Sequence, residues 1–230
     1  MILRYVFLTL AAASTLHTTE TVFKEDFERF SPDALLEEGP NGIWHVIGFN
    51  SNTHNGTAVV VQGTGSNISR VARITPTSPD EKPSATSTSI FAHYPEVSGK
   101  IRFETRLYAE NGAGQVLLRH GKGKNAITPI YLLFRLRPKV ELVAYGPNGS
   151  ENTISLGPYK HKKWYRLVIQ ADTDKQQYDL ELIDAESGTS EISVTGLEFY
   201  QPATTLNGLI LGAIFGASSV YLWDDVVIAR

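Results

Sequence analysis

The chain has 230 residues, of which 42% are hydrophobic and 20% are charged, and its formal net charge at pH 7 is -3. This composition is typical of a folded globular domain and excludes a disordered chain, and the length suits one large domain. Cysteine is absent, which excludes a disulfide framework, a thiol nucleophile and thiolate metal sites.

The N-terminal segment has the pattern of an export signal. Arg4 is the only charged residue before Glu20, and the apolar run over residues 5–13 ends in an A-x-A sequence, which signal peptidase cleaves. The run is shorter than the roughly 20 apolar residues that a membrane-spanning helix needs. We expect residues 1–19 to be a signal peptide with a short leader, and residues 20–230 to be one domain, secreted or periplasmic in a bacterium. The alternatives are a misassigned start and a buried N-terminal strand.

Short strand patterns then follow one another to the end of the chain. Turn clusters separate them, such as Gly-Pro-Asn-Gly at 39–42 and Gly-Pro-Asn-Gly-Ser at 146–150, and the one helix candidate, Ser31–Glu38, is short. Many short strands between evenly spaced turns predict an all-β fold, a two-sheet antiparallel β-sandwich. The predicted strands are Val22–Glu28, Ile43–Ile47, Ala58–Gln62, Ser69–Thr75, Thr86–His93, Lys100–Tyr108, Gln115–His120, Ile130–Leu136, Val140–Tyr145, Thr153–Leu156, Trp164–Ala171, Tyr178–Ile183, Glu191–Thr195, Gly208–Ile214 and Ser219–Ile228.

The first and last predicted strands can pair to close the sandwich, and both carry carboxylates. Carboxylate oxygens are ligands that calcium prefers, so the two strands together offer a structural calcium site. The candidate ligands are Glu25, Asp26, Glu28, Asp224 and Asp225. Alternatively, these carboxylates bind Lys24, Arg29 or backbone N–H groups.

Two other predicted strands carry basic and aromatic side chains on one face. Because successive side chains of a strand point to opposite faces, each set forms a row. The first row is Arg102, Glu104, Arg106 and Tyr108, and the second is Tyr131, Arg135 and Arg137. If the strands are neighbours, the rows line one basic face, which suits an anionic polysaccharide because arginine binds carboxylates through two parallel hydrogen bonds. The alternative is a solvated face with cross-strand Arg–Glu pairs.

Charge is unevenly distributed along the chain. Residues 100–139 contain nine Lys or Arg and two Glu, whereas residues 172–230 contain ten acidic residues and two basic ones. The basic block predicts a positive patch if its strands are adjacent. The acidic block and the predicted export both argue against nucleic acid as a partner.

Six segments spread over the chain carry a family resemblance. They are Phe23–Glu28, Val97–Glu104, Tyr159–Val168, Ala171–Asp174, Gln177–Glu181 and Trp223–Ile228. In them the chain resembles the concanavalin A-like lectin/glucanase superfamily, in particular laminin-G-like bacterial domains. The resemblance implies a jelly roll of two antiparallel sheets, one of them concave. It also implies that the concave face receives carbohydrate and that a calcium ion is held at the rim or back.

The catalytic motifs of this superfamily match only in part. The Glu-x-Asp-x-x-Glu run of laminarinase-like glucanases has no counterpart. Alginate lyases of the same fold carry R-x-E-x-R, which residues 102–106 match, and a Gln-Ile-His or Gln-Val-His motif, for which His120 stands loosely. Their Tyr-x-Lys-x-Gly run is missing. As a lyase, the protein would use Arg102 and Arg106 to neutralise the uronate carboxylate and His120 or Tyr131 to abstract the proton.

The patterns together favour a secreted carbohydrate-binding or cell-surface interaction module without catalytic activity. Its basic sheet face would hold an acidic polysaccharide that carries uronate or sulfate groups. The first alternative is a polysaccharide lyase that cleaves a uronate-containing glycan by β-elimination. The second is a structural domain of a cell envelope.

Overall fold

A computed structural model describes residues 20–36, 43–48, 56–76, 87–122, 125–136, 139–147, 152–214 and 219–230. The predicted signal peptide and leader at 1–19, and Arg137, lie outside these residues. No helix within the described ranges is long and apolar enough to cross a membrane.

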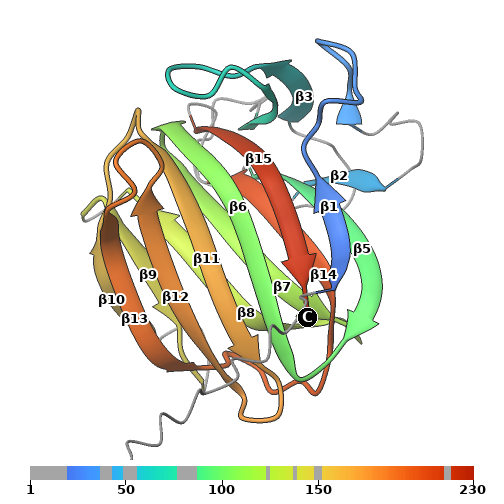
Figure 1. Ribbon diagram of the computed structural model, residues 1–230, viewed down its shortest axis with the longest axis vertical. Helices are drawn as coiled ribbons and strands as arrows, with labels where there is room; N and C mark the ends of the chain where they lie inside the picture. The colour runs from blue at the N-terminus through green and yellow to red at the C-terminus, as the bar shows by residue number, and fades with distance from the viewer. Residues whose placement is uncertain are drawn as a thin grey trace, which may run out of the picture.

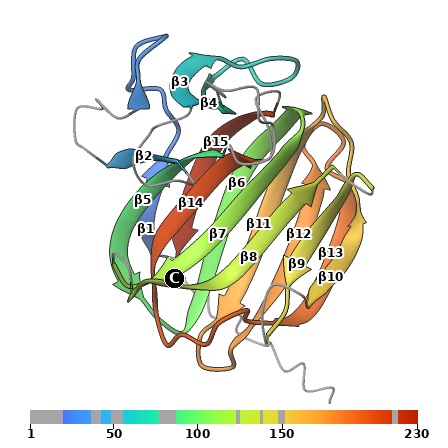
Figure 2. The same cartoon turned by 180° about the vertical axis from the view of Figure 1, so that it is seen from behind.

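The strands form two antiparallel sheets that face each other (Figures 1 and 2). Sheet A contains β1 (Thr21–Glu25), β3 (Gly56–Gln62), β4 (Arg70–Pro76), β6 (Lys100–Asn111), β11 (Trp164–Asp172), β12 (Gln177–Asp184), β13 (Ser190–Glu198) and β15 (Val220–Ala229). Sheet B contains β2 (Trp44–Gly48), β5 (Thr88–Val97), β7 (Ala113–His120), β8 (Ile127–Arg135), β9 (Glu141–Tyr145), β10 (Thr153–Pro158) and β14 (Leu206–Ile214).

The strand orders are β13-β12-β11-β6-β15-β4-β3 in sheet A, with β1 paired to β15, and β10-β9-β8-β7-β14-β5-β2 in sheet B. The prediction of an all-β, two-sheet antiparallel sandwich is confirmed, and no α-helix occurs in the described ranges. The strand predicted over Val22–Glu28 ends early, at Glu25. There the Glu25 carboxylate accepts a hydrogen bond from the Phe27 N–H, and Phe27 takes a positive φ of 58°, which turns the chain out of the sheet.

One hydrophobic core fills the space between the sheets because the strands alternate apolar and polar side chains. In β6 the side chains of Phe103, Thr105 and Leu107 are buried, whereas the polar residues between them are partly exposed. Phe134 of sheet B packs on Tyr221 and Trp223 of sheet A, with ring centroids 6.1 and 6.5 Å apart. These contacts tie the two sheets together across the core.

The chain changes sheet between β6 and β7, at a single residue. Gly112 has a φ of 77°, and a Cβ atom there would lie 2.1 Å from the Ser219 Oγ atom. Only glycine combines this backbone conformation with so close a neighbour. As a consequence β6 belongs to sheet A, whereas β7 and β8 belong to sheet B. The outward side chains of β6 and β8 therefore lie on opposite sides of the molecule.

Candidate binding faces

The first predicted row lies on the outer face of sheet A, which we call the charged face: Arg102, Glu104, Arg106 and Tyr108 on β6 together with Arg166 on β11. The Glu104 carboxylate accepts hydrogen bonds from Arg102 at 2.6 Å and from Arg166 at 3.3 Å. Arg106 and Arg166 stand directly opposite each other in the strand register. The charged face thus contains one cross-strand Arg–Glu pair, Arg166–Glu104, of the kind expected in the second interpretation of the sequence, and one pair within β6, Arg102–Glu104.

Aromatic contacts and a further ion pair complete this arrangement. The Arg106 guanidinium lies 3.7 Å from the Asp225 carboxylate and 5.6 Å from the ring centroid of Trp164. Tyr108 packs on Trp164 with ring centroids 5.4 Å apart, and the Trp164 indole N–H donates to the Thr64 carbonyl at 2.6 Å. Arg106 is therefore paired and stacked by neighbours on the same sheet, whereas Arg102 and Arg166 share the single carboxylate of Glu104.

The second predicted row lies on the other side of the protein. Tyr131 and Arg135 belong to β8, so they are on the outer face of sheet B. The prediction that both rows line one face is wrong for the described residues, because the chain crosses to the other sheet between β6 and β7. No single basic face joins Arg102 and Arg106 to Tyr131 and Arg135.

Three tyrosines cluster on the outer face of sheet B, which we call the aromatic face: Tyr131 on β8, Tyr145 on β9, and Tyr200 between β13 and β14. The Tyr131 and Tyr145 rings are stacked, with centroids 4.3 Å apart and planes at 18°. The Tyr200 ring meets both edge to face, at 6.4 and 5.8 Å. Burial, followed by the neighbouring tyrosines, raises the pKa of Tyr131 to about 12. The three rings are partly exposed.

Side chains from flanking strands meet above the central strand β14 on this face. Gln115 accepts a hydrogen bond from the Tyr131 hydroxyl at 3.2 Å and donates one to the Ser89 Oγ atom at 3.1 Å. The second bond passes over Gly212, where a Cβ atom would lie 2.1 Å from the Ser89 Oγ atom and 3.2 Å from the Gln115 Cγ atom. The missing side chain of Gly212 is what permits the network to span from β5 to β8.

Two arginines accompany the tyrosines, and they differ in how they are paired. Arg135 forms an ion pair with Glu141, which also accepts a hydrogen bond from Ser155. The Ser155 and Arg135 hydrogen bonds lower the pKa of the Glu141 carboxyl. Arg119 has no ion pair within the described ranges, its Nε atom is buried without a partner there, and burial lowers its pKa. Its guanidinium lies 5.9 Å from the ring centroid of Phe91, and its Nη2 atom donates to the Ala126 carbonyl at 3.5 Å. Arg119 is thus a cation without a carboxylate partner in the described ranges.

The four residues considered for a lyase do not form one site. Arg102 and Arg106 are on the charged face, and Tyr131 is on the aromatic face. The His120 Nδ1 atom lies 2.7 Å from the Thr205 hydroxyl, which donates to Glu96 at 2.7 Å. A carboxylate-neutralising group and a base on opposite sides of the core cannot act on the same sugar, so the combination of Tyr131 with Arg102 and Arg106 is wrong. The role of His120 as the base stays a prediction.

The carboxylates near the N-terminus bind protein donors. Glu25 is buried and accepts hydrogen bonds from the Phe27 N–H at 2.9 Å, from the Trp44 indole at 3.2 Å and from Arg29. Glu28 accepts from the Arg70 N–H at 2.7 Å, and Asp26 lies 3.4 Å from the Lys24 ammonium. These contacts agree with the alternative stated for the sequence, in which the carboxylates bind Lys24, Arg29 or backbone N–H groups.

The carboxylates of the last strand are also engaged. Asp224 is buried and accepts hydrogen bonds from the Asn67 amide at 2.7 Å and the Ser69 hydroxyl at 2.6 Å. Burial raises the pKa of Asp224. Asp225 pairs with Arg106. Across the described ranges, no group of three or more His, Asp or Glu side chains could hold a metal ion, so the five predicted ligands do not gather into a calcium site.

Sequence reasoning found Tyr131 and Arg135 but missed several members of the aromatic face. Tyr145 and Gln115 could have been found. Tyr145 is the last residue of one predicted strand and Gln115 the first of another, and the alternation in each strand points the side chain away from the core. Tyr200 could not have been found, since it lies between strands and reaches the face through a hydrogen bond from its N–H to the Pro129 carbonyl at 2.7 Å.

The fold is similar to solved structures of lectins and carbohydrate-active enzymes, whereas no protein-family model and no curated protein sequence matches the chain. The lectin UEA-II, solved in complex with galactose, is 10% identical, with a TM-score of 0.54 over 90% of this chain and 98% of its own. The exoplasmic/lumenal domain of VIP36, in a Ca2+/Man3GlcNAc-bound form, is 10% identical, with a TM-score of 0.53 over 90% of each chain.

Two enzymes extend this likeness. A β-1,3-glucanase from Mycobacterium marinum is 12% identical, with a TM-score of 0.51 over 92% of this chain and 99% of its own. A sialidase is 13% identical, with a TM-score of 0.61 over 91% of this chain but 18% of its own, so this chain spans less than a fifth of that protein. At these identities the likeness is one of fold alone. It confirms the concanavalin A-like jelly roll that the sequence resemblance implied.

Proposed function

We propose that the protein is an exported, non-catalytic carbohydrate-binding or cell-surface interaction module that binds an acidic polysaccharide through its aromatic face. The observation that carries this proposal is the cluster of Tyr131, Tyr145 and Tyr200, with Arg119 on the same sheet face. Neutral, partly exposed rings offer flat apolar surfaces on which the C–H face of a sugar ring packs, and their hydroxyl groups can bind sugar hydroxyls.

The preference for an acidic glycan rests on Arg119. The register places Arg119 two residues along β7 from Leu117, which pairs with Tyr131, so Arg119 is a diagonal neighbour of Tyr131. A half-buried guanidinium without a carboxylate partner in the described ranges gains from a uronate carboxylate more than an exposed, paired one does. The fold's likeness to lectins supports a sugar ligand, and the N-terminal pattern supports export.

The polysaccharide lyase is the alternative function, and Tyr131 could not serve as its base together with Arg102 and Arg106. The raised pKa of Tyr131 keeps its hydroxyl protonated at neutral pH, and the hydroxyl donates to Gln115, so it is not available to accept a proton. The structural envelope domain is the second alternative, in which these faces contact protein.

Affinity electrophoresis tests the proposal. The purified protein is run in gels cast with pectate, alginate, laminarin or xylan, each with calcium and with EDTA. We expect retardation by pectate or alginate, and a several-fold weaker effect for Tyr145→Ala, because stacking on an aromatic ring contributes about 1 kcal/mol. Tyr108→Ala is the matched control, since it removes a tyrosine from the charged face.

Each other result has a defined meaning. Equal retardation of Tyr145→Ala and the unchanged protein would refute the aromatic face as the site. Unsaturated uronate products, detected by their ultraviolet absorbance, would favour the lyase. Loss of retardation in EDTA alone would revive calcium binding through residues other than the five predicted. Absence of retardation in all four gels would favour the structural domain.

A further inference from the structure

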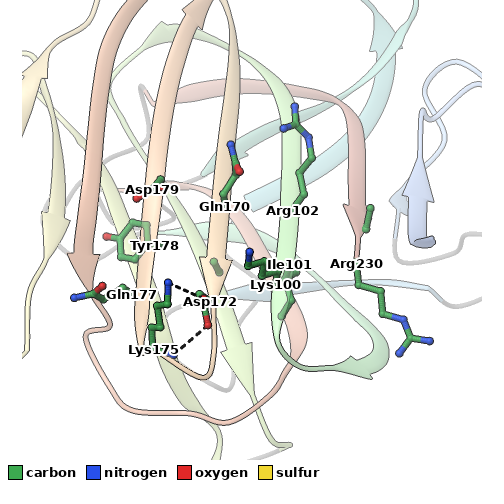
Figure 3. Close-up of a pocket in the computed structure, with 12 residues that line it drawn as sticks. Lys100, Ile101, Arg102, Gln170, Asp172, Lys175, Gln177, Tyr178, Asp179 and Arg230 are labelled. Carbon is green, nitrogen blue, oxygen red and sulfur yellow. Dashed lines mark hydrogen bonds and ion pairs between the residues drawn. The ribbon is translucent and has the colours of Figure 1, made fainter. Parts of the chain in front are cut away.

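A pocket of about 550 Å³ lies on the outer face of sheet A, where β6 begins, β11 and β15 end, and β12 begins (Figure 3). It is far along the strands from the Arg106–Trp164 contact and on the opposite side of the protein from the aromatic face. Its volume is in the range of about 300–1,000 Å³ that is usual for small-ligand sites.

The pocket has a polar floor because neighbouring strands place outward side chains in register. Asp179, Gln170 and Arg102 face one another across β12, β11 and β6, and Ala229 of β15 continues this line. The methyl group of Ala229 is short, which leaves the space beside Arg102 open. The next line consists of Gln177, Asp172 and Lys100.

The two carboxylates in the pocket are already engaged. The Asp172 Oδ1 atom accepts the N–H groups of Asp174 and Lys175, both at 3.1 Å, and its Oδ2 atom lies 3.7 Å from the Lys175 ammonium. The Asp179 Oδ1 atom accepts the N–H group of Gly196 at 2.8 Å. These bonds satisfy the carboxylates from the protein side and leave the donors in the pocket available.

The donors are less fully used. Lys100 has no ion pair or hydrogen bond within the described ranges, and the Arg102 guanidinium uses only its Nη2 atom, toward Glu104. Gln170 adds an amide group between Arg102 and Asp179. A cationic pair beside amides suits a ligand that carries a carboxylate and several hydroxyls on one small ring.

We propose that this pocket binds a uronic acid residue, with Lys100 and Arg102 on the carboxylate and Gln170 and Gln177 on ring hydroxyls. The proposal rests on the proposed function only in taking a glycan as ligand, since the site is separate from the aromatic face. A protein with both sites can hold two glycan chains on opposite sides.

The test uses trigalacturonate as the acidic probe and xylotriose as the neutral one, with binding followed by calorimetry and by backbone amide NMR. We expect trigalacturonate to shift the amide signals of residues 100–102, 170–172 and 177–179. In the double variant Lys100→Gln/Arg102→Gln these shifts should vanish and the Kd at this site should rise at least tenfold, because two charge-assisted contacts are lost. Both substituted side chains point outward, so circular dichroism should be unchanged.

Two results would overturn the proposal. One is that trigalacturonate leaves the amides of the pocket unshifted in the unchanged protein. The other is that xylotriose shifts them equally, which would remove the role of the carboxylate. The variant Tyr145→Ala separates this proposal from the previous one: it should abolish shifts around Tyr131 and Tyr145 and leave those of the pocket intact.

Discussion

The two outer faces of the sandwich are both polar, yet they are built in different ways. On the charged face the contacts join immediate neighbours: Glu104 binds Arg102 of its own strand and Arg166 of the next, and Arg106 lies between Trp164 and Asp225. On the aromatic face one network also reaches across a whole strand, because Gly212 allows Ser89 and Gln115 to meet above β14. The difference teaches that contacts between neighbours need only side chains of the right kind, whereas a network across a strand also needs a position without a side chain.

The largest effect is expected when a side chain fills the space above β14 and disrupts the contact between Ser89 and Gln115. Gly212→Val should lower the free energy of unfolding by about 1–3 kcal/mol, because the new side chain collides with Ser89 and Gln115. Ala229→Val is the matched control on the charged face, where the neighbouring pocket of about 550 Å³ has room for the added methyl groups. Urea denaturation measures both. Equal losses in the two variants would contradict the claimed difference between the faces.

A pH-dependent effect is expected at the edge of the aromatic face. Hydrogen bonds from Ser155 and Arg135 lower the pKa of Glu141 from its ordinary value of 4.5. A carboxyl with a lowered folded-state pKa stabilises the fold above its ordinary pKa and loses that contribution as the pH falls through the folded-state value. Glu141→Gln should therefore cost about 1 kcal/mol at pH 7 and progressively less below pH 4.5.

Thermal unfolding of the Glu141→Gln variant and the unchanged protein between pH 7 and pH 2.5 makes this comparison. Curves that stay parallel over the whole pH range would show that the Glu141 contacts do not depend on ionisation.

The smallest effect is expected on the charged face. Glu104→Gln removes the carboxylate that Arg102 and Arg166 share. Arg166 then faces Arg106, its partner in the strand register, without a negative charge beside it. The free energy of unfolding should fall by about 0.5 kcal/mol at low salt, since exposed ion pairs contribute little. The loss should shrink in 0.5 M salt, where charges are screened within about 4–5 Å. A loss that is independent of salt would point to packing as the cause.

The candidate faces were predictable only one strand at a time. The alternation in Lys100–Tyr108 correctly placed Arg102, Glu104, Arg106 and Tyr108 on one side, and the alternation in Ile130–Leu136 did the same for Tyr131 and Arg135. The prediction that the two rows share a face was wrong because the alternation within a strand does not show to which sheet the strand belongs. The prediction of a calcium site was wrong for a related reason. The Glu25 carboxylate binds an N–H group, an indole and a guanidinium, and the sequence alone does not show which of these donors lies near it in the fold.

The sequence by itself determined the strands, their inward and outward faces, and the all-β sandwich, because side-chain alternation and turn chemistry are local properties of the chain. The tertiary structure decided which faces share a side, and it did so through Gly112, where a left-handed backbone carries the chain from sheet A to sheet B. It also assembled the tyrosine cluster and the pocket at the beginning of β6 from strands that are distant in sequence. Those sites depend on strand order and register, which long-range packing of the core fixes.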